Sequence, residues 1–246
     1  MDDNLIFGRN AVMELLKSGR SVNKLFIAEG SRDGSIQKIF SLAKMAGIVV
    51  ESISRDKLDK ICSGRHQGVA AMAAAINYST VEELLELAES KNESPFIILL
   101  DELDDPQNFG AILRTAEAVG VHGVIIPKRR SVQLNATVFK TSAGAAEYVK
   151  VAQITNVAQT LKNLRGRGLR IIGSDMSAEV NFNQADLTGG IVLIIGSEGK
   201  GMRRLTRENC DLLIKIPMIG KINSLNASAA GAVLMYEIFL QRKQND

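Results

Sequence analysis

The sequence predicts an α/β protein in two parts: a small α/β domain over residues 1–77 and a larger one over 95–246, joined by a linker over 78–94. Short apolar runs that suit buried strands alternate with stretches that have one apolar helical face. In the second part these runs are almost continuously apolar, which is typical of parallel strands covered on both faces. We therefore expect a doubly wound parallel sheet there.

In the first domain, helices are expected over 7–18, 35–46 and 55–61, and strands over 24–28, 48–50 and 69–76. The first helix has Val12, Leu15 and Leu16 at helical spacing, and Gly19 is a stop signal. An acidic helix through Glu89 and a polar stretch ending in Pro95 follow. We interpret this region as a domain junction; the alternative is a surface helix within a single domain.

In the second domain, strands are expected over 96–100, 124–126, 169–172, 191–195 and 214–216. Helices are expected over 109–119, 135–143, 156–165 and 225–240. The last helix is rich in Ala, Ser and Gly, and such small residues allow another backbone to approach closely.

Composition excludes several classes of protein. The hydrophobic fraction of 46% is too high for a disordered chain. No stretch approaches the roughly 18 apolar residues of a membrane span, and the acidic start at Met1 is unlike a signal peptide. Only Cys62 and Cys210 are present, so a disulfide framework is excluded and a cytoplasmic location is expected.

The charge is unevenly distributed. Residues 1–77 carry 11 Lys and Arg against 8 Asp and Glu, whereas residues 78–246 carry 19 of each. The whole net charge of +3 therefore lies in the first domain. This asymmetry indicates a polyanion-binding module joined to a neutral one, although an ordinary basic surface explains it equally well.

Several kinds of catalytic site are absent from the sequence. Ile194 stands where a phosphate-binding loop ending at Lys200 needs glycine, and no nucleophile elbow occurs. The two histidines, His66 and His122, have no metal-ligand spacing, so no metal is expected. His122 directly precedes an apolar run and is interpreted as structural.

Three polar segments follow apolar strands in the second domain. The first has Asp105 and Pro106 as helix-start signals, with Asn108 near the helix mouth and Arg114 six residues further on. The second has three glycines within 196–201, and the third, 223–228, precedes the small-residue helix. Ser224 or a neighbour is expected to cap that helix. Taken singly, the segments are equally explained as a capped amphipathic helix, a tight turn and a second capped helix.

Together and in this order, the segments resemble the three sequence motifs of the SpoU/TrmH family of SPOUT RNA methyltransferases. Asn108 and Arg114 occupy polar positions of the first motif, residues 196–199 the second and residues 223–228 the third. Residues 7–12 and 65–69 resemble the substrate-binding extension, of ribosomal-protein L30e-like fold, found in the family's 23S rRNA guanosine 2′-O-methyltransferases.

The resemblance implies S-adenosylmethionine as methyl donor and a ribose 2′-hydroxyl of RNA as acceptor, here a guanosine of 23S rRNA. It also implies a deep trefoil knot in the second domain and a homodimer formed through that domain. The residues that match the family's cofactor site are Ser174, Gly196, Gly199, Ile216, Met218, Ser224 and Leu225.

The resemblance further implies a catalytic group made of Arg114, Asn108, Glu198 and Asn226. The family's first-motif arginine has been suggested as the base, but an arginine is normally protonated at neutral pH. We instead expect Arg114 to hold the target phosphate and polarise the hydroxyl, with the other three residues orienting Arg114 and the ribose.

RNA contacts are expected from basic residues, because the few aromatic residues of the first domain lie in apolar patterns typical of a core. The candidates are Arg9, Arg65, His66, Lys128, Arg129 and Arg130. Binding that depends on phosphates should weaken as salt is added. Two alternatives stay open: a tRNA ribose methyltransferase of the same family, and a non-catalytic RNA-binding protein of ribosome assembly.

Overall fold

The computed structural model describes residues 4–244, except for Arg32, Ser63, Ile76 and 222–223. The chain divides into two compact units. Unit 1 comprises residues 1–77 and 134–148, and unit 2 comprises residues 78–133 and 149–246. None of the described helices is both long and apolar enough to cross a bilayer.

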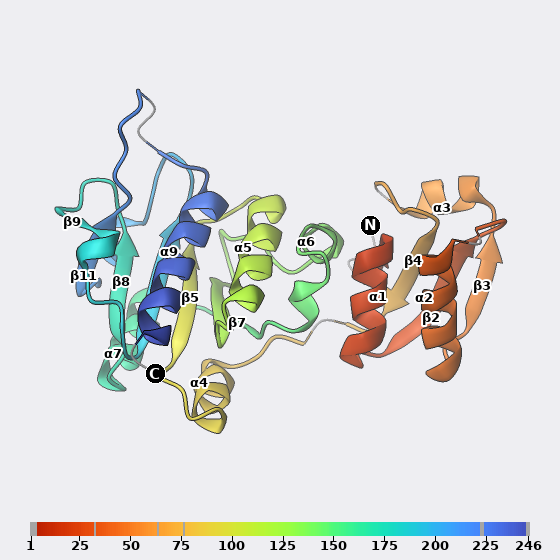
Figure 1. Cartoon of the computed structure of the whole chain (residues 1–246), viewed down its shortest axis with the longest axis horizontal. Helices are drawn as coiled ribbons and strands as arrows, with labels where there is room; N and C mark the ends of the chain where they lie inside the picture. Colours follow the sequence, from red (N-terminus) through yellow and green to blue (C-terminus); the bar gives the residue numbers. More distant parts are fainter. Residues whose placement is uncertain (1–3, 32, 63, 76, 222–223, 245–246) are drawn as a thin grey trace. The chain divides into compact units, whose positions relative to one another are not determined.

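Unit 1 is built on a four-stranded mixed sheet with the strand order β1-β4-β2-β3 (Figure 1). Its strands are β1 (Leu5–Phe7), β2 (Val22–Ala28), β3 (Val50–Ile53) and β4 (Val69–Ala73). Its first three helices are α1 (Arg9–Ser18), α2 (Gly34–Met45) and α3 (Arg55–Ile61), close to the predicted ranges. The sequence missed β1, because three residues are too few to show a period, and placed β3 too early.

Two short elements from later in the chain complete unit 1. They are α6 (Ala136–Thr141) and η1 (Ala145–Glu147), which the sequence assigned to the second domain. Ala136 packs against the apolar cluster around Phe7 and Leu58. The compact unit therefore does not follow chain order.

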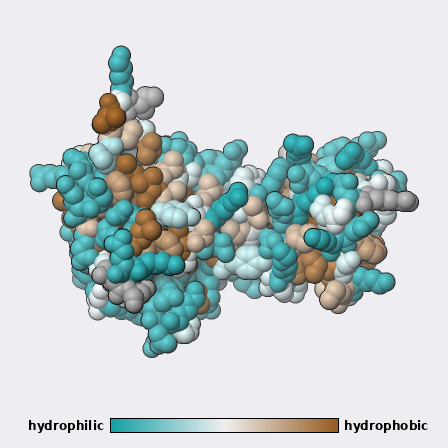
Figure 2. Space-filling model, viewed as in Figure 1, coloured by the Kyte–Doolittle hydropathy of each residue, from teal (hydrophilic) through white to brown (hydrophobic). Residues whose placement is uncertain are grey.

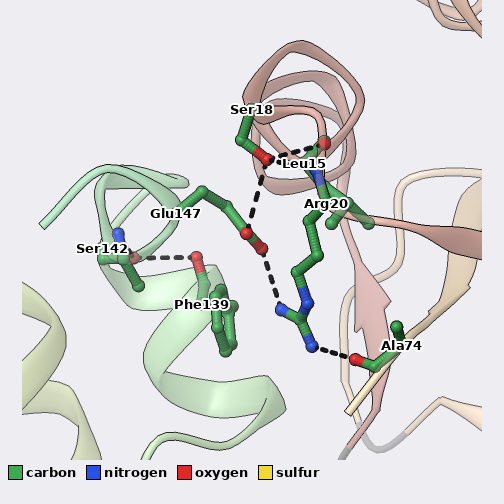
Figure 3. A network of polar contacts seen from close by, with 8 residues as sticks. Leu15, Ser18, Arg20, Ala74, Phe139, Ser142 and Glu147 are labelled. Carbon is green, nitrogen blue, oxygen red and sulfur yellow. Dashed lines mark hydrogen bonds and ion pairs between the residues drawn. The ribbon is translucent and has the colours of Figure 1, made fainter. Parts of the chain in front are cut away.

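A buried ion pair fastens this insertion to the rest of unit 1 (Figure 3). Arg20 Nη1 lies 3.0 Å from Glu147 Oε1, and the two side chains are only 15% and 4% exposed. Arg20 also donates to the Ala74 carbonyl at 2.6 Å, and its guanidinium lies 4.9 Å from the centre of the Phe139 ring. Burial raises the pKa of Glu147, although Arg20 and the Ser18 hydroxyl act to lower it.

Unit 2 is a seven-stranded parallel sheet with the order β7-β6-β5-β10-β8-β11-β9, which confirms the predicted fold class. The strands are β5 (Phe96–Asp101), β6 (Gly123–Pro127), β7 (Val151–Ile154), β8 (Arg170–Ser174), β9 (Val180–Asn181), β10 (Ile191–Gly196) and β11 (Leu212–Lys215). The helical segments are α4 (Val81–Ser90), α5 (Pro106–Ala118), α7 (Val157–Gly166), η2 (Phe182–Gln184), α8 (Arg204–Glu208) and α9 (Ala227–Lys243). The sequence missed β7 and β9, which are short, and α8.

Helices cover both faces of this sheet. Leu84 of α4 and Leu161 of α7 pack on the face that holds Ile97 and Val192. On the opposite face, α5 and α9 lie side by side in front of the central strands (Figure 1). A Cβ at Gly231 of α9 would lie 2.8 Å from Ile195 Cδ1, so glycine lets α9 come close to β10.

His122 has the structural position expected from the sequence. Its Nδ1 accepts a hydrogen bond from the Phe96 amide at 2.9 Å, and its Nε2 lies 3.0 Å from Glu93 Oε2. Burial lowers the pKa of His122, against the opposing effect of Glu93. The ring therefore joins the segment before β6 to the start of β5 in its neutral form.

We expect Glu147→Ala to destabilise the protein by about 3 kcal/mol, because Arg20 is then left buried without its ionic partner. The double variant Arg20→Met with Glu147→Leu should recover most of this loss, since no uncompensated charge remains. Equilibrium unfolding in urea, followed by circular dichroism, measures both changes. Equal losses in the single and double variants would contradict this role of the pair.

Candidate active site

The candidate site lies where the two central strands of unit 2 end. Strands β5 and β10 are parallel neighbours in register, with Asp101 opposite Gly196 at their carboxyl ends. The segments after these strands lead into α5 and to the glycine-rich loop. Open α/β sheets bind ligands at this edge.

The first turn of α5 places Asn108. Asp105 caps the helix by accepting hydrogen bonds from the amides of Gln107 and Asn108, both at 3.1 Å, and Pro106 occupies the first helical position, as expected. Asn108 is only 7% exposed, so its amide needs partners within the protein.

The first turn of α9 is organised by Asn226. Its Oδ1 accepts hydrogen bonds from the amides of Ser228 at 3.0 Å and Ala229 at 3.2 Å. The expected cap is thus the neighbour Asn226 and not Ser224 itself. Asn223, which the third motif also includes, lies outside the described residues.

Asn108, Glu198 and Asn226 form a closed triangle of hydrogen bonds, which we call the polar triangle. Asn108 Nδ2 donates to Glu198 Oε1 at 2.8 Å, and Asn226 Nδ2 donates to Asn108 Oδ1 at 2.9 Å. Asn226 Nδ2 also donates to Glu198 Oε1. Three segments far apart in the sequence are therefore joined by side chains that the sequence had grouped.

Two cavities meet beside the polar triangle and share Ser197, Glu198 and Lys200. One, of about 350 Å³, is mixed in polarity and is lined by the loops after β8, β10 and β11 and by the start of α9. We call it the loop cavity. The other, of about 550 Å³, is lined by the segment between β5 and α5 together with Arg130, and we call it the acidic cavity because four of its residues are Glu or Asp.

All seven residues predicted to contact a cofactor line the loop cavity. Gly196 lies at its narrowest constraint: a Cβ there would be 2.4 Å from the Gly201 carbonyl carbon and 2.5 Å from the Met202 nitrogen. The loop closes on itself, because the Gly201 amide donates to the Ser197 carbonyl at 2.9 Å. Backbone groups and small residues thus form much of this wall.

The structure does not bring Arg114 into the polar triangle. Arg114 lies six residues beyond Asn108 on α5, about 9 Å along the helix axis. Its side chain is exposed, and it forms no hydrogen bond or ion pair with any residue that the structure describes.

The expected RNA-contact residues fall in both units. In unit 1, Arg65 is exposed, whereas Arg9 is tied to Asp33 at 2.5 Å and to Ser35. His66 is 5% exposed; its Nδ1 accepts from the Gly68 amide and its Nε2 lies 2.9 Å from Asp59, so it is poorly placed to contact a phosphate. In unit 2, the consecutive basic residues Lys128, Arg129 and Arg130 are all exposed.

Two carboxylates of the site were not singled out from the sequence. Asp101 is fully buried and accepts hydrogen bonds from the Arg203 amide and Nε, both at 2.8 Å, which fastens the loop after β10 to the end of β5. Asp175 lines the loop cavity; burial raises its pKa, but Ser177 and Arg207 lower it to below its usual value. An acidic residue ending or following an apolar strand was the available signal. The described residues contain no cluster of three or more potential metal ligands.

Comparison with known proteins places this architecture. Residues 95–236 match the model of the SpoU rRNA Methylase family, and residues 5–79 match RNA 2'-O ribose methyltransferase substrate binding. A putative TrmH family tRNA/rRNA methyltransferase of Bacillus subtilis, YacO, is 50% identical over 96% of this chain and 95% of its own. A putative TrmH family tRNA/rRNA methyltransferase of Staphylococcus aureus is 43% identical over 100% of this chain and 98% of its own.

Solved structures agree with the fold. The SpoU methyltransferase AviRb of Streptomyces viridochromogenes, in complex with AdoMet, has a TM-score of 0.82 at 21% identity and covers 96% of this chain and 89% of its own. The A. aeolicus TrmH/SpoU tRNA modifying enzyme has a TM-score of 0.57 at 31% identity over 67% of this chain and 84% of its own. The family match extends over more than half of the chain, and the relatives align along nearly all of it. The chain therefore belongs to the SpoU rRNA methylase family, a family of RNA methyltransferases.

Proposed function

We propose that this RNA methyltransferase, whose methyl donor is S-adenosylmethionine, methylates the 2′-hydroxyl of a ribose in ribosomal RNA, specifically a guanosine of 23S rRNA. The observation that carries the proposal is the junction of two cavities at the polar triangle. One cavity can hold a donor and the other an acceptor, with Ser197 and Glu198 at their common wall. The substrate-binding match over residues 5–79 supports an RNA acceptor.

The loop cavity is suited to S-adenosylmethionine. Its volume of about 350 Å³ lies within the usual range for small-ligand sites. Ile216, Met218 and Leu225 supply apolar surface, while Ser174 and Ser224 supply hydroxyls. The absence of a side chain at Gly196 leaves the backbone open to close approach. When bound, S-adenosylmethionine supplies an electrophilic methyl group on a sulfonium.

On the acceptor side, the protein has to hold the ribose in line and remove the hydroxyl proton as the new bond forms. In this proposal, the polar triangle fixes the wall against which the ribose rests. Asn108 and Asn226 are positioning residues here, since their hydrogen bonds hold Glu198 at the junction of the cavities. Arg114 holds the target phosphate and polarises the 2′-hydroxyl.

The position of Arg114 supports a homodimeric enzyme. On one protomer it stands exposed about 9 Å along α5 from Asn108, away from the polar triangle. The neighbouring α9 exposes Val233, Tyr236 and Leu240, which lie three and four residues apart and so share one helical face (Figure 2). We infer that this apolar stripe meets a second copy and that Arg114 serves the site of the partner subunit.

The remaining parts of the proposal concern domain roles. Residues 1–77 bind the RNA substrate, with Arg9 and Arg65 as phosphate contacts, and residues 95–246 carry the methyltransferase site, with 78–94 between them. The chain of the second domain forms the trefoil knot expected of the family. The enzyme works in the cytoplasm, in keeping with its two free thiols.

Mapping ribose methylation in rRNA and tRNA from a strain that lacks this gene tests the substrate. We expect one modified guanosine to be lost from 23S rRNA and to return when the gene is restored. Loss of a tRNA site would instead identify a tRNA ribose methyltransferase. No lost site, together with no binding of S-adenosylmethionine by calorimetry, would favour a non-catalytic assembly protein.

Replacing Gly196 with alanine should weaken the binding of S-adenosylmethionine at least tenfold, because the new Cβ meets the backbone of Gly201 and Met202. Gly199→Ala is the matched control. Gly199 also lines the cavity, but a Cβ there would meet no atom within 4 Å, so the change costs about 1 kcal/mol through its positive φ of 78°. Calorimetric titration compares the two. Equal affinities in both variants would contradict the close approach proposed at Gly196.

Arg114→Lys separates geometry from charge, because lysine keeps the positive charge but loses the planar fork of donors. We expect turnover to fall about 100-fold while RNA and cofactor affinities stay near those of the parent enzyme. Arg170→Lys, at the opposite edge of the sheet, is the control and should leave turnover unchanged. Near-normal turnover of Arg114→Lys with intact RNA binding would contradict the role of Arg114.

A further inference from the structure

A third cavity of unit 2 lies at the same edge of the sheet and has no place in the chemistry described above. It measures about 810 Å³ and lies at the ends of β6 and β7 and the beginnings of α7 and α8. Five of its twelve lining residues are basic and none is acidic: Lys128, Arg129, Arg130, Arg203 and Arg204. We call it the basic cavity.

Most of this positive charge is not compensated. Lys128, Arg129 and Arg130 form no ion pair or side-chain hydrogen bond with any part of the chain that the structure describes. Arg203 is neutralised by the buried carboxylate of Asp101 at 2.6 Å, and Arg204 pairs with Glu208 in the solvent. Within the described residues, the cavity therefore combines two paired cations with three that have no ionic partner.

The backbone holds these residues in place without a ligand. The Lys128 amide donates to the Ile154 carbonyl at 2.8 Å, which fastens the loop after β6 to the end of β7. The Gln133 side chain donates to the Pro127 carbonyl at 3.1 Å. The α7 N-terminus at Asn156 also lies on the cavity and adds the partial positive charge of its first amides.

The acidic cavity has the opposite character. Glu102, Asp104, Asp105 and Glu198 line it, so its carboxylates can accept hydrogen bonds from hydroxyls or base N–H groups but repel phosphates. Arg130 lines both cavities and so lies where they adjoin. A nucleotide whose ribose rests in the acidic cavity therefore needs its neighbouring phosphates elsewhere.

We propose that the basic cavity binds backbone phosphates of the RNA strand next to the methylated nucleotide. This inference rests on the proposed function, because it takes the acidic cavity as the place of the target ribose. Lys128 and Arg129 hold phosphates directly, and Arg130 marks the passage of the strand from one cavity to the other. The ligand is a polynucleotide strand, since the cavity is open and continues into the acceptor site.

The test is the salt dependence of RNA binding, measured by filter binding without S-adenosylmethionine. The probe is rRNA purified from a strain that lacks the gene. Arg129→Gln should reduce the slope of log affinity against log salt by about 0.7 to 0.9, the value for one lost phosphate contact, and Lys128→Gln with Arg129→Gln by about twice that. Arg129→Lys should keep the parent slope.

Lys162→Gln is the matched control, because it removes one exposed positive charge from α7 outside the cavity. An unchanged slope in Arg129→Gln, or an equal reduction in Lys162→Gln, would overturn the proposal. Release of the RNA by equimolar GTP, lost in Arg129→Gln, would also overturn it and identify a free-nucleotide site. Binding is read separately from methyl transfer, so a parent enzyme that methylates no rRNA refutes the proposed function without deciding this result.

Discussion

The polar triangle of Asn108, Glu198 and Asn226 is the interaction on which the rest of the site depends. Its hydrogen bonds join positions that are 90, 118 and 28 residues apart in the chain. Asn108 is buried, so its amide is satisfied only when the loop after β10 and the start of α9 are both in place. The same contacts that shape the wall between the loop cavity and the acidic cavity thus also report that the edge of the sheet has assembled correctly.

Around this triangle, the carboxyl edge of the sheet separates ligands by charge. The acidic cavity has carboxylates that suit hydroxyls and N–H groups, the loop cavity presents backbone and small residues, and the basic cavity presents a cluster of cations. These differences arise from the residues that follow each strand, not from the strands themselves. Because all the strands are parallel, every one of these segments emerges at the same edge. The fold therefore brings chemically different surfaces together without requiring them to be adjacent in sequence.

The division into units follows a different physical logic from the division of the sequence. Residues 134–148 lie within the span that matches the methyltransferase family, yet they pack in unit 1 through a buried Arg20–Glu147 pair. Three crossings of the chain, at residues 77–78, 133–134 and 148–149, consequently connect the units. Burial keeps the pKa of Glu147 high despite Arg20, so desolvation outweighs attraction in this pair and its contribution is specific geometry more than stability.

The sequence by itself determined the parallel α/β class, most helices, the Asp105–Pro106 helix start and the grouping of Asn108 with Glu198 and Asn226. These depend on local patterns or on short motifs whose residue types carry their own geometry. It did not reveal β1, β7 or the docking of 134–148, and it offered His66 as a phosphate contact although both ring nitrogens are engaged inside unit 1. Only the tertiary structure decided these points, because strand pairing, burial and charge compensation depend on partners far away in the chain.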